Sequence, residues 1–171
     1  MVDSLKNLAT IPDDVVVGGD SQRDDRDKRY VAMYDEQARN YDERSFSSRG
    51  GEFSKRYKNT LIDEMLRKYE TNSQHRVLLD CPAGTGRMTH FIATDISCDE
   101  IIACDISPNM LEKNQQSMPE TGAKVSFHVA NMKSLPLESE TVSVACVTSF
   151  LYLIPREEYS DYLLDLSLIH I

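Results

Sequence analysis

Acidic residues and glycines follow two apolar runs of the chain, a pattern typical of nucleotide-cofactor sites. Asp80 ends the run "RVLLD", and Gly84 and Gly86 follow it closely. Because glycine has no Cβ, the backbone there can approach a ligand and adopt conformations that other residues avoid. Asp105 ends the next run, "EIIACD", at about the 20-residue distance from which a carboxylate can bind ribose hydroxyl groups. These residues predict a site for a ligand that contains a ribose.

The glycine bend excludes one class of ligand and disfavours another. A phosphate-binding loop needs G-x-x-x-x-G-K-[ST], and the chain has no lysine at that place. A dinucleotide fingerprint needs G-x-G-x-x-G, but Thr89 takes the third glycine position and Asp80 would repel a pyrophosphate. A nicotinamide-dependent oxidoreductase is therefore the less favoured alternative. Acids after both runs suit a ligand with a ribose, a positive charge and no phosphate, which is the chemistry of S-adenosylmethionine (SAM).

Three segments in order carry a resemblance to a known family. They are "VLLDCPAGTGR", "ACDISPNML" and "ANMKSLPLESETVSVACVTSFLYL". Together they resemble class I SAM-dependent methyltransferases of the small-molecule kind, with a methyltransferase type 11/25-like domain, over roughly residues 30–166. The resemblance implies SAM as cofactor and a Rossmann-like open parallel α/β sheet with flanking helices. It also implies that only the first four strands of the family's seven are present.

The resemblance further implies which residues bind the cofactor. Pro82 replaces the first glycine of the family's loop, and Asn131 replaces the acid that usually lies beside the adenine amino group. The side-chain carbonyl of Asn131 could still accept a hydrogen bond there, without charge assistance. Ser143 stands where the family usually has another acid. The cofactor-binding residues expected by position are Asp80, Pro82, Ala83, Gly84, Gly86, Arg87, Asp105, Ile106, Met110, Asn131 and Met132, with Tyr34 and Tyr41 from a lid.

The elements that must hold these residues alternate between strand and helix patterns. Apolar strand-like runs precede Asp80 and Asp105, and two more fall at 124–131 and 141–150. Helical patterns fall between them, one of which has Ser107 as N-cap and Pro108 as its first residue. Such alternation predicts a parallel sheet, and the family's strand order would be 3-2-1-4. We expect a flexible tail at 1–28 and a SAM-binding domain at 29–171, with lid helices at 29–70 and an incomplete α/β core at 75–171.

The chemistry of methyl transfer leaves few marks in this sequence. Transfer is an in-line displacement at the methyl carbon, so the protein mainly supplies alignment and a dry site. No motif names a base, and His90 and His128 are candidates by residue type only. Tyr152 follows the fourth strand and could contact a small-molecule acceptor or simply pack. A non-catalytic binding protein with the same fold remains the alternative of a different class.

The totals limit the partners. A net charge of −9 disfavours nucleic acid, no run is long enough to span a bilayer, and no leader is recognisable, so we expect a cytoplasmic protein. The four cysteines form no CxxC pair or metal-ligand spacing, which predicts reduced core residues and no metal site. The ending "SLIHI" does not read as a natural domain end and suggests C-terminal truncation. A truncated sheet would expose the edge of its fourth strand to self-association.

Overall fold

The computed structural model describes residues 21–46, 56–57, 59–65 and 75–169. Within these residues the core is one parallel sheet with the strand order β3-β2-β1-β4, which confirms the order expected from the sequence. Leu78 of β1 pairs with Ile101 of β2, and Asp80 pairs with Ala103. The strands are β1 (Val77–Asp80), β2 (Glu100–Asp105), β3 (Lys124–Val129) and β4 (Val144–Cys146).

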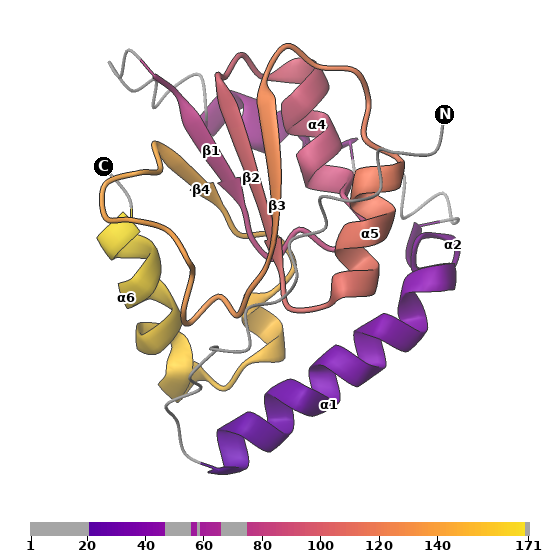
Figure 1. Cartoon of the computed structure of the whole chain (residues 1–171), viewed down its shortest axis with the longest axis vertical. Helices are drawn as coiled ribbons and strands as arrows, with labels where there is room; N and C mark the ends of the chain where they lie inside the picture. Colours follow the sequence, from indigo (N-terminus) through magenta and orange to yellow (C-terminus); the bar gives the residue numbers. More distant parts are fainter. Residues whose placement is uncertain (1–20, 47–55, 58, 66–74, 170–171) are drawn as a thin grey trace, which may run out of the picture.

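The sheet is covered by helices on both faces, as the alternation of strands and helices predicts (Figure 1). Leu78 and Ile101 point to the face that α4 (Arg87–Asp95) covers. Leu79 and Ile102 point to the opposite face and pack in one cluster with residues of α6 (Tyr159–Ile169). Neighbouring residues of a strand point to opposite faces, so β1, with both faces covered, is apolar until its terminal acid.

Helix α5 (Pro108–Gln116) begins as the sequence predicts. The Ser107 hydroxyl accepts a hydrogen bond from the Met110 backbone nitrogen at 3.2 Å, and Pro108 occupies the first turn. This cap satisfies an otherwise unpaired N–H at the helix start. Because β2 ends at Asp105, the cap also fixes the short loop that carries the cofactor-binding candidates after that strand.

The N-terminal helix is longer than the sequence analysis expects. Helix α1 spans Ser21–Gln37, so the prediction of a flexible tail to residue 28 is wrong for residues 21–28, while residues 1–20 lie outside the described part. The mixed charge run "DSQRDDRDK" at residues 20–28 is typical of a tail because it has no apolar residue, but Arg26 pairs with Glu158, far along the chain. A short 3-10 turn (Ala38–Asn40) and α2 (Tyr41–Phe46) follow. We call α1, this turn and α2 the lid.

Two expected helices differ in detail from the structure. Tyr57, Leu61 and Met65 recur at helical spacing, which predicts a helix with a buried apolar stripe within the expected lid region. Residues 56–57 and 59–65 are indeed helical, but these three side chains are exposed. The sequence from Pro155 also predicts a helix, with Leu163 on the same apolar stripe as Tyr162 and Leu166. In the structure this segment starts with a 3-10 turn (Arg156–Glu158) before α6, and Leu163 is exposed. Of the helices in the described ranges, none is long and apolar enough to cross a membrane.

Candidate functional site

A pocket lies at the carboxyl ends of the four strands and is lined there by residues of the loops that follow them. Helix α1 passes beyond this edge of the sheet (Figure 1). In an open parallel sheet this is the edge where ligands bind, beside the point at which the strand order reverses. Here the reversal lies at β1, because β2 follows on one side and β4 on the other. The predicted cofactor residues that line the pocket are Tyr34, Tyr41, Pro82, Ala83, Gly84, Arg87, Asp105, Ile106, Met110, Asn131 and Met132.

The glycine bend after β1 lines this pocket with backbone that no side chain covers at Gly84. The Ala83 nitrogen donates to the Cys104 carbonyl at 2.8 Å, which ties the bend to the end of β2. Gly84 has a φ of +55°, and a Cβ built on it would meet no atom within 4 Å. Gly84 lines the pocket, so a ligand can approach the peptide closely at this position, and most other residues would be strained there by the positive φ.

Gly86 lines no part of the pocket, and its requirement is of another kind. It is the N-cap of α4 with a φ of +96°. A Cβ on Gly86 would lie 2.2 Å from Oδ1 of Asn114 and 2.7 Å from Nε2 of His90. The glycine therefore allows α4 and α5 to approach each other. The family resemblance implies a cofactor contact at Gly86, whereas the structure shows a packing contact between two helices there.

Asp80 also lies outside the pocket lining, behind the bend. Its side chain is fully buried, and its Oδ2 accepts a hydrogen bond from the Thr89 hydroxyl at 2.6 Å. That hydroxyl in turn accepts from the Asn114 amide at 2.9 Å. Oδ1 of Asp80 is buried with no hydrogen-bond partner. Burial raises the pKa of Asp80 to about 7, against the lowering effect of the Thr89 hydrogen bond.

Asp105 is the acid that faces the pocket. Its Oδ2 accepts a hydrogen bond from the Gly84 nitrogen at 2.8 Å, and its Oδ1 accepts one from the Ser107 nitrogen at 2.9 Å. The carboxylate thus joins the glycine bend to the loop that opens α5. Burial raises its pKa, while the backbone hydrogen bonds oppose the rise. Since a carboxylate oxygen can accept more than one hydrogen bond, both oxygens can still accept from ribose hydroxyl groups.

Two carboxylates of the lid form hydrogen bonds with the loops that follow β1 and β2. Asp35 of α1 accepts hydrogen bonds from the Ser107 hydroxyl and, at 3.2 Å, from the Asn109 nitrogen. Asp42 of α2 accepts from the Thr85 hydroxyl at 2.8 Å. Thr85 belongs to the glycine bend, so the lid is bound to the loops after both β1 and β2.

Two tyrosines of the lid line the pocket beneath it. Tyr34 and Tyr41 lie edge to face, with ring centroids 6.4 Å apart. Burial, followed by the neighbouring Tyr41, raises the pKa of Tyr34 to about 12. Burial and Tyr152 raise the pKa of Tyr41. Both hydroxyl groups are therefore neutral at physiological pH.

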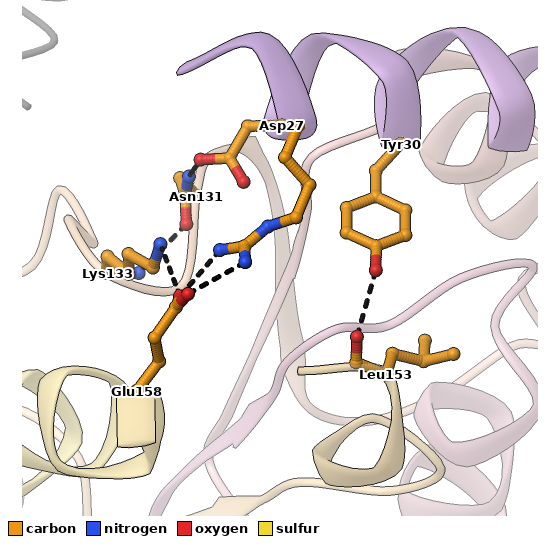
Figure 2. A network of polar contacts seen from close by, with 7 residues as sticks. Asp27, Tyr30, Asn131, Lys133, Leu153 and Glu158 are labelled. Carbon is orange, nitrogen blue, oxygen red and sulfur yellow. Dashed lines mark hydrogen bonds and ion pairs between the residues drawn. The ribbon is translucent and has the colours of Figure 1, made fainter. Parts of the chain in front are cut away.

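Asp27 of the lid also lines the pocket, although it was not among the residues predicted from the sequence. Its Oδ2 accepts a hydrogen bond from Nδ2 of Asn131 at 2.7 Å (Figure 2). One residue earlier, Arg26 binds both carboxylate oxygens of Glu158 at 2.7 and 2.5 Å. Asp27, Tyr30 and Tyr34 are spaced at i, i+3 and i+7, which puts all three on one face of a helix. Had the helical pattern of the lid been followed towards the N-terminus from Tyr34, it would have predicted Asp27 on the pocket face.

The segment after β4 completes the pocket. Thr148, Ser149, Phe150, Leu153 and Ile154 line it, and Tyr162 of α6 joins them. By contrast, the exposed Tyr152 and the two candidate histidines do not line the pocket.

Ser143, which stands where the family usually has an acid, has a structural place before β4. Its hydroxyl is buried and accepts a hydrogen bond from the backbone N–H of Val77 at 3.2 Å, which holds the start of β1. In the described ranges, no three His, Cys, Asp or Glu residues form a group that could hold a metal ion.

The α/β core that carries most of this pocket matches a known protein family. A family model described as a methyltransferase domain matches residues 78–167, more than half of the chain. The chain belongs to this methyltransferase family. The match begins within β1 and ends within α6, so it covers the bend, both acidic loops and the two strands that follow them, β3 and β4. SAM is the cofactor on which this class of methyltransferase depends.

Solved methyltransferases share the fold of this chain at low identity. Phosphoethanolamine N-methyltransferase 1 of Haemonchus contortus, in complex with phosphoethanolamine and S-adenosylhomocysteine, is 16% identical, with a TM-score of 0.66 over 88% of this chain and 30% of that one. A SAM-dependent methyltransferase of Methanosarcina mazei is 18% identical, with a TM-score of 0.53 over 63% and 52%. One from Clostridium acetobutylicum is 21% identical, with a TM-score of 0.51 over 64% and 43%. The methyltransferase chain described here thus spans about half or less of these proteins. No curated protein sequence matches it significantly.

Proposed function

We propose that this chain binds SAM in the pocket under the lid and transfers its methyl group to a small-molecule acceptor by in-line displacement. The observation that carries the proposal is the pairing of Gly84 with Asp105 at the pocket floor. The bend offers open backbone at Gly84, and the Asp105 carboxylate is held 2.8 Å from the same glycine's nitrogen. A carboxylate that accepts hydrogen bonds from ribose hydroxyl groups, beside an accessible peptide backbone, fits a nucleoside that carries an amino-acid chain.

The residues of the pocket fit the parts of SAM in the order of the strands. The methionine part would lie against Gly84 after β1, the ribose against Asp105 after β2, and the adenine beyond it among Ile106, Met110 and Met132. SAM supplies a methyl group on a cationic sulfur, which is already a good leaving group. The chain's own residues then have to align that group and exclude water.

The closed lid favours an acceptor of small size. The lid is bound to the β1 and β2 loops through Thr85 and Ser107, and to the other side of the pocket by the Tyr30 hydroxyl, which donates to the Leu153 carbonyl at 2.9 Å. An acceptor must therefore fit beneath α1 beside Tyr34, whose neutral hydroxyl can donate a hydrogen bond to it. A macromolecule could not reach this position without displacing the lid.

Titration calorimetry with S-adenosylhomocysteine tests the cofactor part of the proposal. We expect saturable binding by the wild type, no binding of NAD, and a loss of about tenfold to hundredfold in affinity for Asp105→Ala, because a charged hydrogen-bond acceptor is removed. The exposed Asp25→Asn serves as the matched control. Circular dichroism must show that each variant is folded. A folded wild type that does not bind S-adenosylhomocysteine would refute the proposal.

A labelling experiment tests the acceptor. The chain is incubated with SAM carrying a radioactive methyl group and with a cell extract separated into small molecules and macromolecules. Label transferred to the small-molecule fraction supports the proposal. Label found in protein or nucleic acid alone contradicts the small acceptor. Binding of S-adenosylhomocysteine without any transfer would point to the non-catalytic alternative.

A further inference from the structure

We propose that Asp27, on lid helix α1, selects the cofactor's base by accepting a hydrogen bond from the exocyclic amino group of adenine. The inference rests on the proposed function and deepens it, because it names a specificity-determining residue of the same pocket. The residue comes from the charge run that looks like a tail in the sequence, and it lies in the pocket lining together with Asn131.

The direction of the ligand follows from the sheet. Ala130, after β3, donates its backbone N–H to the Asp105 carbonyl at 2.9 Å, so the loops after β2 and β3 are adjacent. Neighbouring strands lie about 5 Å apart, so a base attached to a ribose at Asp105 reaches the end of β3. The pocket there has apolar walls, formed by Ile106 and Met110, and a polar end. A flat base with one polar edge fits such a slot.

The polar end consists of Asn131 and Asp27, and Asn131 already has a protein partner at each end of its amide. Its Oδ1 accepts a hydrogen bond from the backbone nitrogen of Lys133 at 3.1 Å, and its Nδ2 donates to Oδ2 of Asp27 at 2.7 Å (Figure 2). Oδ1 of Asp27 has no hydrogen bond to any described residue. Asp27 therefore offers the freer acceptor, and Asn131 is better described as the residue that positions it.

The lid holds Asp27 in place through its neighbours. Glu158 accepts two hydrogen bonds from Arg26 and lies 3.4 Å from the Lys133 ammonium group. Tyr30, one turn after Asp27, donates to the Leu153 carbonyl at 2.9 Å (Figure 2). A bidentate pair of guanidinium and carboxylate fixes direction as well as distance. The carboxylate of Asp27 is thus presented at one position above the loop after β3.

The chemistry of a carboxylate predicts discrimination between bases. An ionised carboxylate only accepts hydrogen bonds, so it attracts the amino group of adenine and repels the carbonyl oxygen that replaces it in hypoxanthine. A site built around a hydrogen bond rejects an analogue that cannot make it. Asparagine has both a donor and an acceptor and can pair with either base.

The test compares S-adenosylhomocysteine with S-inosylhomocysteine, its 6-oxo analogue, by titration calorimetry on the full chain. We expect the wild type to prefer the adenosyl compound by about 10-fold to 100-fold, as for a charge-assisted hydrogen bond. Asp27→Asn should remove most of this preference, and Asp25→Asn, exposed on the same helix, should keep it. Because both ligands are measured on each variant, a general loss of folding or affinity cancels in the ratio.

Other results overturn the inference in distinct ways. If Asp27→Asn keeps the preference while Asp105→Ala loses binding, the proposed function stands and the role of Asp27 is wrong. If Asn131→Ala removes the preference and Asp27→Asn does not, Asn131 is the acceptor. If the folded wild type binds neither compound, the proposed function fails and this inference fails with it.

Discussion

The buried carboxyl group of Asp80 should make the stability of this chain depend on pH in an unusual direction. Burial raises the pKa of Asp80 from the ordinary value of 3.8 to about 7 in the folded chain. The unfolded chain therefore releases this proton near pH 4, whereas the folded chain keeps it to about pH 7. Between these values the folded state binds one proton more, so the free energy of unfolding falls as the pH rises.

The magnitude follows from the two pKa values. A pKa difference of about 3 corresponds to about 4 kcal/mol, because each pKa unit is worth about 1.4 kcal/mol. This contribution is fully present below pH 4 and is lost as the pH rises through 7. Between pH 5 and pH 8 the expected loss is about 2.5 kcal/mol. Asp80→Asn keeps the shape of the neutral acid and an acceptor for the Thr89 hydroxyl, so it should abolish this loss.

Urea unfolding followed by circular dichroism at pH 5, 6, 7 and 8 measures the effect. The quantity to compare is the difference between Asp80→Asn and wild type at each pH, because other groups titrate equally in both. This difference should grow by about 2.5 kcal/mol in favour of the variant from pH 5 to pH 8. Glu120→Gln, at an exposed position, should follow the wild type. Parallel curves for Asp80→Asn and wild type would refute the reasoning and mean that Asp80 is ionised in the folded chain at pH 5.

Three other perturbations test the packing and the lid. Gly86→Ala should lower the free energy of unfolding, measured in urea, by about 2–4 kcal/mol, because a Cβ would lie 2.2 Å from Asn114 and this overpacking adds to backbone strain. An equal cost in an Asn114→Ala background would show that the clash is not the cause. Ser143→Ala should cost about 1–3 kcal/mol by leaving the first N–H of β1 unpaired, and a thermal shift no larger than that of an exposed Ser117→Ala would contradict this. The Arg26 hydrogen bonds lower the pKa of Glu158 to about 2, so that pair stabilises the fold above about pH 4.5 and loses its effect as the pH falls toward 2. Arg26→Met should remove this part of the acid sensitivity, which melting curves at pH 3 and pH 6 would measure; an unchanged difference between the two pH values would mean that the pair adds no stability.

Much of the core could be predicted because its signals are local. Apolar runs of strand length, the Ser107 cap with Pro108, and the acids at the ends of β1 and β2 are read from neighbouring residues. The parallel arrangement follows from the alternation of strands and helices, and the strand order from the family resemblance. Gly84 and Asp105 converge because the carboxyl ends of adjacent parallel strands meet at one edge of the sheet.

The sequence by itself determined the family, the fold and about half of the residues that line the pocket, since those depend on spacing and residue type. Only the tertiary structure decided which distant residues these site residues contact. Gly86 needs its missing side chain because Asn114 lies against it, and Asp27 becomes a pocket residue because Asn131, 104 residues away, is folded against its helix. Such contacts depend on how distant segments pack, and no local pattern of charge or hydrophobicity records that.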